Sequence, residues 1–169
     1  MGKKRVAIIG GGQVAEKVHV SYYRSREEIE LAAVVSPNAD RAKNFAERND
    51  IPHYYTDASE MYAAEKPDMV SICTPNRNHY ENVMLALENG CDVLCEKPPA
   101  ISADEARKMR DAAIQNNCLL AYNFHHRFAD DVTIIREKAE EGMLGDIYVV
   151  KVKALRRCGI PGWGSFTNK

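Results

Sequence analysis

Short apolar runs alternate along this chain with longer segments whose apolar residues recur at helical spacing. Runs of about four to eight apolar residues predict strands, and a period of about 3.6 residues predicts helices. The strands are predicted at residues 5–9, 31–35, 53–55, 69–73, 92–95 and 119–122. The helices are predicted at residues 14–26, 39–49, 58–64, 78–89, 103–115 and 131–141, with Asn38, Asp57 and Ser102 as N-caps.

The alternation of strands and helices sets the expected fold class. Strands separated by helices pair in parallel through right-handed crossovers. The first, second, fourth and fifth strands are mostly apolar without alternation, which is typical of strands covered on both faces. We therefore predict an α/β fold with a doubly wound parallel sheet, of Rossmann type, over residues 1–122.

The last part of the chain has a different pattern. Residues 147–155 are rich in β-branched residues and partly alternate with polar ones, which predicts a strand with one face in water. Because one strand cannot form a sheet, we expect residues 123–169 to hold a connecting helix and the first strand of an incomplete α+β domain for substrate binding or oligomerisation. The chain would then end inside that domain. Its strand would either pair with a second copy, as a homo-oligomer, or stay unpaired.

A glycine-rich motif, residues 10–15 with the sequence GGGQVA, directly follows the first predicted strand and opens the first predicted helix. In that context it is typical of a dinucleotide-binding turn, and the alternative is an ordinary glycine-rich turn. Gly10 permits the tight turn, Gly12 lets the main chain approach a diphosphate, and Ala15 keeps the helix close to its strand. The helix start at Gln13 and Val14 offers free N–H groups to the phosphates.

Composition narrows the classes of function. Lys and Arg number 23 and Asp and Glu number 24, so nothing indicates an electrostatic surface for nucleic acid. No apolar run reaches the roughly 18 residues of a membrane span, and the run before Gly10 is too short for a signal peptide. The five cysteines form no Cys-x-x-Cys pair, so we expect no metal site and free thiols in a reducing cytoplasm.

Three further blocks follow the glycine motif in order. They are Thr74-Pro75-Asn76 with His79, then Glu96-Lys97-Pro98, then the stretch at Trp163-Gly164. With the glycine motif, they make the chain resemble the Gfo/Idh/MocA family of NAD(P)-dependent oxidoreductases. The resemblance implies hydride transfer between a nicotinamide and a hydroxyl-bearing carbon of a sugar, a polyol or a related small molecule.

The resemblance assigns roles to the residues after the fourth long strand. Rossmann-type ligands bind outside the carboxyl ends of strands, where Thr74, Pro75 and Asn76 are expected to border the cofactor. His79 begins the next helix. It is expected either to contact the cofactor or to be an exposed histidine at a helix start.

Lys97 is the one residue to which the resemblance assigns a catalytic role. In the family this lysine points into the cleft between nicotinamide and substrate, and its peptide bond to the following proline is often cis. A cation there would hydrogen-bond the substrate hydroxyl and favour its deprotonated form as hydride leaves. Glu96 is expected to contact the cofactor or to orient Lys97. The alternative for Lys97 is a surface lysine beside a turn.

The end of the second strand bears on the choice between NAD and NADP. An acidic residue usually stands at the position of Ser36, where it binds the ribose hydroxyls of NAD. Ser36 removes the repulsion against a 2′-phosphate, and Arg41 follows five positions later. The pattern slightly favours NADP, although Arg41 fits a solvated helix residue equally simply.

Candidate substrate residues follow the sixth strand and lie near the end of the chain. Family members carry polar and basic residues there, so the resemblance implies cleft positions for Asn123, Arg127 and Trp163. The family also places an Asp and a His, the acid–base partner of the lysine, in a downstream block that this sequence lacks. We therefore expect the cofactor-binding half of an oxidoreductase, inactive alone. The alternative is a non-catalytic dinucleotide-binding or regulatory module, which would not need Lys97.

Overall fold

A computed structural model describes residues 2–153 and 155 of the chain. Six parallel strands form one sheet in the order β3-β2-β1-β4-β5-β6. The order runs outward in both directions from β1, so the sheet is doubly wound, as predicted. The strands are β1 (Lys4–Ile9), β2 (Ile29–Val35), β3 (His53–Tyr55), β4 (Met69–Ile72), β5 (Asp92–Cys95) and β6 (Leu120–Tyr122).

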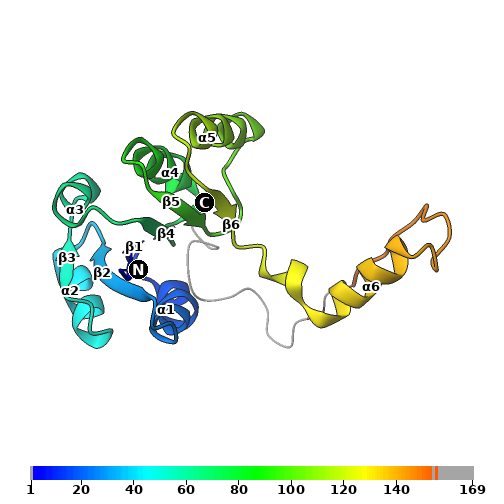
Figure 1. The fold of residues 1–169 in the computed structure, drawn as a ribbon, viewed down its shortest axis with the longest axis horizontal. Helices are drawn as coiled ribbons and strands as arrows, with labels where there is room; N and C mark the ends of the chain where they lie inside the picture. Colours follow the sequence, from blue (N-terminus) through cyan, green and yellow to red (C-terminus); the bar gives the residue numbers. More distant parts are fainter. Residues whose placement is uncertain (1, 154, 156–169) are drawn as a thin grey trace. The chain divides into compact units, whose positions relative to one another are not determined.

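Helices cover both faces of the sheet (Figure 1). The helical segments η1 (Ala15–Val20) and α1 (Ser21–Arg24) pack on one face with α2 (Ala39–Arg48). Against the other face pack α3 (Ala58–Glu65), α4 (His79–Glu88) and α5 (Ala103–Gln115). The predicted N-caps are confirmed, because Asn38, Asp57 and Ser102 each accept a hydrogen bond from a main-chain N–H of the helix that follows.

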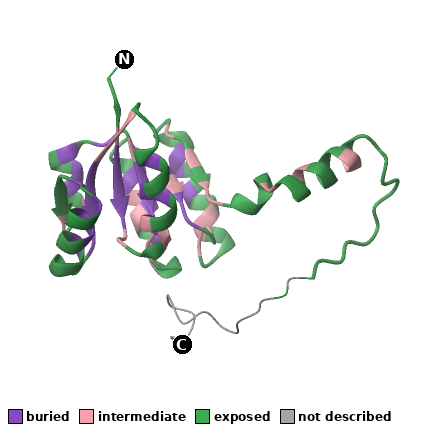
Figure 2. Ribbon diagram, turned by 90° about the horizontal axis from the view of Figure 1, so that it is seen from below, coloured by how far each residue is buried: buried purple, intermediate pink, exposed green. Residues whose placement is uncertain are grey.

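The core lies on both faces of the strands, as the unbroken apolar runs predicted (Figure 2). Residues 6–9 of β1 are all buried, and so are residues 32–35 of β2. Because β1 occupies the middle of the sheet, its side chains contact the helices of both layers. The ends of these central strands are therefore fixed by packing on two sides, which is what positions the residues that follow them.

The first helical segment is not a plain α-helix. Its first part, η1, is a π-helical turn, and α1 continues it only as far as Arg24. Ala15, His19 and Val20 are all buried there. In an α-helix residues 15 and 20 would lie roughly 140° apart around the helix axis, so both could not face the sheet. The π-helical turn has more residues per turn, and it therefore places Val20 on the same buried side as Ala15 and His19. The sequence pattern predicted a helix here without indicating its type.

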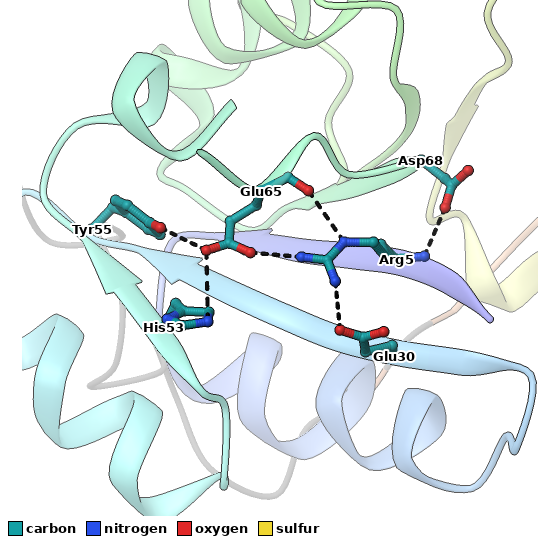
Figure 3. A network of polar contacts seen from close by, with 6 residues as sticks. All are labelled: Arg5, Glu30, His53, Tyr55, Glu65 and Asp68. Atoms are coloured by element: carbon teal, nitrogen blue, oxygen red, sulfur yellow. Dashed lines mark hydrogen bonds and ion pairs between the residues drawn. The ribbon is translucent and has the colours of Figure 1, made fainter. Parts of the chain in front are cut away.

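A polar network around Arg5 ties α3 and the entry to β4 to the first two strands (Figure 3). The Arg5 guanidinium donates to Glu30 Oε1 and to Glu65 Oε2, each at 2.7 Å. Its main-chain N–H donates to Asp68 Oδ2 at 2.8 Å. Tyr55 donates from its hydroxyl to Glu65 Oε1 at 2.6 Å, so the nearly buried Glu65 carboxylate is bound on both oxygens.

The described residues divide into two compact units, the first ending at Asn123 and the second beginning at Phe124. The second unit contains η3 (His125–Phe128) and α6 (Asp130–Glu140). The predicted strand at 147–155 is wrong for its described part, since residues 147–153 and 155 adopt no strand. A strand needs a neighbour to receive its hydrogen bonds, and no second strand occurs among the described residues of this unit.

Across residues 2–153 and 155, no helix is both long and apolar enough to cross a membrane.

Candidate dinucleotide site and active site

The residues that directly follow five of the strands form one row at the carboxyl edge of the sheet. Each continues the ladder of main-chain hydrogen bonds by one further donor. Gly10 N donates to Val35 O at 2.9 Å, Ser36 N to Tyr55 O at 3.0 Å, Cys73 N to Ile9 O at 2.8 Å, Glu96 N to Ile72 O at 2.9 Å and Asn123 N to Cys95 O at 2.9 Å. Four of these five residues were predicted site residues, and the structure brings them to one edge.

Gly10 and Gly12 have different surroundings within the glycine motif. Gly10 has φ +99°, and a Cβ there would lie 2.8 Å from main-chain atoms of Cys73 and Thr74. Glycine is therefore required at this position to let β1 end beside β4. A Cβ on Gly12 would meet no atom within 4 Å. The space above Gly12 is open, as the approach of a diphosphate to the main chain requires.

The helical segment after Gly12 fits an anionic ligand. Gln13 is exposed and Val14 half-buried at its start, while Ala15 is wholly buried against the sheet. The first N–H groups of a helix have no partner within the helix, so they are available to phosphate oxygens. The residues present therefore fit the diphosphate of NAD or NADP, whose nicotinamide would supply the hydride acceptor.

Ser36 and Arg41 lie at the end of β2 and in the first turn of α2. Ser36 is almost buried, whereas the Arg41 side chain is exposed. Asn38 fixes the main chain between them, because its Oδ1 accepts the N–H of Arg41 at 2.9 Å. The Arg41 guanidinium has no hydrogen bond or ion pair with the described residues, which leaves it available to a ligand.

Thr74, Pro75 and Asn76 follow β4 as predicted. Pro75 and Asn76 are exposed, and Asn76 opens a short 3-10 turn, η2 (Asn76–Asn78). Thr74 Oγ1 is buried and has no hydrogen-bond partner among the described residues. An unpaired buried hydroxyl is costly, so Thr74 Oγ1 has an unused hydrogen-bonding capacity in this loop.

His79 is buried and joins two loops of the site. The exposed-histidine expectation is wrong, because the side chain is wholly inaccessible. Its Nδ1 lies 2.8 Å from Pro98 O and its Nε2 lies 3.0 Å from Thr74 O. With both ring nitrogens facing main-chain carbonyls, His79 joins the Thr74 loop to the Lys97 loop, and its contact with the cofactor stays a prediction.

Lys97 lies just beyond the row, on the loop after β5. The side chain is exposed, and its ammonium makes no hydrogen bond or ion pair with the described residues. The peptide bond from Lys97 to Pro98 is cis, as the resemblance implied. Lys97 thus offers an unpaired cation one residue beyond the edge where the cofactor residues gather.

Glu96 is nearly buried beside this free lysine and is bound by residues from two other elements. Its Oε1 accepts from His19 Nε2 at 2.9 Å and from Asn123 Nδ2 at 2.6 Å. Burial alone would raise the pKa of Glu96, but these donors hold it below its ordinary value. Glu96 is therefore an anion at neutral pH. The prediction missed His19 completely, because the sequence pattern indicates a helix at this position but not the π-helical turn that buries His19 beside Val20.

The remaining predicted residues are spread over three regions. Asn123 ends the first unit and binds Glu96 through its amide nitrogen. Arg127 is exposed in η3 of the second unit. Trp163 lies outside the described residues. A cavity of about 330 Å³ on the η1 face of the sheet is mostly apolar and borders His19 and Asn123, so it meets the strand-end row only at Asn123.

Cysteine nucleophiles are not part of this site. Burial raises the pKa of Cys95 to about 12, and burial likewise raises the pKa of Cys73 far above its ordinary value. Thiols of this kind stay protonated and unreactive at neutral pH. The chemistry available at the edge is therefore that of main-chain amides, polar side chains, the bound Glu96 carboxylate and unpaired cations such as Lys97 and Arg41.

A doubly wound sheet of this strand order, with an open glycine turn after β1, defines a dinucleotide-binding Rossmann domain. The sequence profile of a family described as "Oxidoreductase family, NAD-binding Rossmann fold" matches residues 4–124. The chain belongs to this family, Gfo/Idh/MocA, as the resemblance indicated.

Individual relatives support the assignment over different lengths. D-glucoside 3-dehydrogenase of Escherichia coli K12 is 53% identical over 165 residues, which cover 98% of this chain and 47% of that protein. The scyllo-inositol 2-dehydrogenase (NADP(+)) of Bacillus subtilis 168 is 37% identical over 116 residues, 69% of this chain and 35% of that protein. The chain therefore spans less than half the length of these curated relatives.

A solved structure of similar fold is that of KijD10, a 3-ketoreductase from Actinomadura kijaniata in complex with NADP and TDP-benzene. It aligns with a TM-score of 0.76 at 26% identity, covering 83% of this chain and 43% of the other.

Proposed function

We propose that residues 1–123 bind NAD(P) along the carboxyl edge of the sheet and that Lys97 assists hydride transfer at a hydroxyl carbon of a sugar or polyol. The row of strand-end residues carries this proposal, because it places the open main chain at Gly12 and the free Lys97 ammonium in one described unit. Among substrates, D-glucosides are favoured, since the 53% identical relative bears that name.

Each part of the row has a distinct role in this proposal. The helical segment after Gly12 holds the diphosphate through its N–H groups, and Thr74 supplies its unpaired hydroxyl to the bound dinucleotide. When bound, the nicotinamide takes up or returns the hydride of the reacting carbon. Lys97 donates a hydrogen bond to the oxygen on that carbon and stabilises its negative charge as the hydroxyl proton passes to a base, the role that the resemblance assigns to a histidine of the downstream block. Glu96 sets the direction in which the Lys97 loop leaves β5.

The preference between the two nicotinamide coenzymes is the finer part of the proposal. Ser36 carries no negative charge that would repel a 2′-phosphate, and Arg41 is unpaired in the next helical turn. Both features favour NADP slightly over NAD. The family description names NAD, whereas the scyllo-inositol 2-dehydrogenase and KijD10 are named with NADP, so these comparisons support either coenzyme.

Gly12→Ala tests the binding site without disturbing the fold. The added methyl group meets no protein atom, so thermal unfolding should be unchanged, whereas binding of NADH and NADPH should fall about tenfold or more because the methyl group occupies the approach to the diphosphate. Gly2→Ala, also in open space, is the matched control and should leave both properties unchanged. Tight coenzyme binding by Gly12→Ala, measured by fluorescence titration, would refute this site.

Lys97→Met tests the reaction itself. The assay follows nicotinamide absorbance with methyl glucosides and inositols, and the control is Lys108→Met, an exposed lysine of α5. Loss of turnover in Lys97→Met with unchanged coenzyme binding would support an enzyme. Because the chain is expected to be inactive alone, coenzyme binding without turnover in the unmodified protein would fit both the half-enzyme and the non-catalytic module, and only turnover that depends on Lys97 separates them.

A further inference from the structure

We propose that His19 is a positioning residue for Lys97, acting through the Glu96 carboxylate that it binds in the interior. This inference rests on the proposed role of Lys97. It concerns a residue of the first helical segment, well before the Glu96-Lys97 motif in the sequence and outside every motif that carries the family resemblance.

The contacts of His19 leave it only one arrangement toward Glu96. The side chain is nearly inaccessible, with Nε2 at 2.9 Å from Glu96 Oε1 and Nδ1 at 3.2 Å from Ser71 Oγ. Glu96 is ionised and can only accept, so Nε2 must carry the proton between them. Ser71 Oγ also lies 2.5 Å from the Tyr23 hydroxyl. Four buried side chains thus form one continuous chain of hydrogen bonds that ends at Glu96.

The π-helical turn is what allows this contact. It places His19 and Val20 on the buried side together, so that Val20 packs in the core while His19 reaches across to Glu96. Irregular turns of this kind in helices are frequent at functional sites. The same helical segment begins at the proposed diphosphate site, so His19 links that segment to the Glu96-Lys97 loop.

The geometry at Glu96 directs the effect to Lys97. Both strong donors, His19 and Asn123, bind Oε1, whereas Oε2 has only the main-chain N–H of Lys97 at 3.4 Å. Fixing Oε1 therefore fixes the plane of the carboxylate and keeps Oε2 over the Lys97 peptide. Without His19, the carboxylate would rotate about its side chain, and it would be free to pair with the Lys97 ammonium or to turn away from it.

A spectroscopic test reads out Lys97 directly and needs no turnover. The lysines of the full chain are dimethylated with ¹³C-formaldehyde, and the Lys97 signal is identified by its loss in Lys97→Arg. His19→Leu, which keeps bulk but removes both nitrogens, should shift and broaden that signal. His19→Gln, whose amide can still donate to Glu96, should restore it. His53→Leu is the matched control, because His53 also lies near a buried carboxylate, Glu65, at 3.9 Å.

The outcomes separate a positioning role from a merely structural one. An unchanged Lys97 signal in folded His19→Leu overturns the inference. A shift in His19→Gln as large as that in His19→Leu overturns it as well. If His19→Leu does not fold, Glu96→Gln decides, because it must shift the Lys97 signal as well. The double variant should show no further shift, since both changes act through one contact.

Turnover adds a second readout where the unmodified protein has activity. His19→Leu should lower kcat about ten- to a hundredfold while leaving coenzyme affinity and KM unchanged. If Lys97→Met leaves turnover intact, the proposed function fails. If Lys97→Met is inactive but the Lys97 signal is unchanged in His19→Leu, the proposed function stands and only this inference fails.

Discussion

The amino and carboxyl ends of the sheet are built in opposite ways. At the amino end, Arg5 binds the carboxylates of Glu30, Glu65 and Asp68, so each of these charges has a partner (Figure 3). At the carboxyl end, the Lys97 and Arg41 cations have no partner among the described residues, and the main chain at Gly12 faces open space. The first arrangement uses its polar groups within the protein, and the second leaves them available for another molecule.

This difference shows how one sheet serves two purposes. Paired charges at the amino end stabilise the docking of α3 and β4 onto β1 and β2. Unpaired groups at the carboxyl end contribute little to folding and can be changed without loss of the core. Substitutions at the amino end should therefore lower the free energy of unfolding, and substitutions of unpaired groups at the carboxyl end should lower coenzyme affinity. A substitution that changes the other property would contradict this difference.

Gly10→Ala should have the largest effect, because this position belongs to the binding edge but is needed for folding. The new Cβ would lie 2.8 Å from the main chain of Cys73 and Thr74, directly after β4, at a φ of +99°. We expect a loss of about 3 kcal/mol or more in the free energy of unfolding. Urea denaturation measures this. A Gly10→Ala variant as stable as the unmodified chain would mean that the two strands do not meet as described.

Glu65→Gln should have the next largest effect and should act at the other end of the sheet. The substitution leaves the Arg5 guanidinium without one charged partner and weakens the bond from Tyr55. We expect a loss of about 2 kcal/mol in the free energy of unfolding, with coenzyme affinity of the folded protein unchanged. Glu60→Gln, exposed on the same helix, is the control. Weakened coenzyme binding would contradict the separation of the two ends.

Acid should destabilise the protein by a smaller amount, partly through Glu96. Hydrogen bonds lower the folded-state pKa of Glu96 below its ordinary 4.5, so its contribution is complete above that value and is lost as the pH falls through the lowered pKa. Glu96→Gln should therefore flatten the fall of unfolding free energy below about pH 4.5. The exposed Glu88→Gln should not. Identical pH profiles for Glu96→Gln and the unmodified chain would contradict this assignment.

Ser36→Asp should have the smallest effect, one confined to coenzyme choice. A carboxylate at this position repels a 2′-phosphate, so NADPH affinity should fall about tenfold relative to NADH. Arg41→Ala should act in the same direction through loss of a cation, and neither change should alter unfolding. Parallel fluorescence titrations with both coenzymes give the ratio. An unchanged ratio in both variants would remove the preference for NADP.

The sheet could be predicted from the sequence because apolar runs determine which segments are buried. The strand-end row could then be predicted as well, because parallel strands end at one edge of a sheet. Gly10, Ser36, Glu96 and Asn123 were identified in this way. His19 was missed because hydrophobic spacing over a dozen residues indicates a helix but not its hydrogen-bond pattern. The burial of His79 was not predicted, because its two carbonyl partners, at Thr74 and Pro98, are not recognisable before the loops fold together.

The strand at 147–155 failed for a different reason. Its β-branched residues do favour an extended conformation, but a strand exists only with a neighbour, and composition does not supply one. Helices α3 to α5, whose hydrogen bonds lie within each segment, did not depend on such a partner and formed where the periodicity predicted.

Every residue in the strand-end row donates its own main-chain N–H to the neighbouring strand. The main-chain hydrogen bonds of the sheet therefore hold the row in place, largely independently of its side chains. A designer could therefore exchange those side chains, at Ser36 for instance, to recruit another nucleotide while the scaffold beneath keeps its shape. Gly10 and Glu96, whose neighbours depend on them, are closed to such redesign.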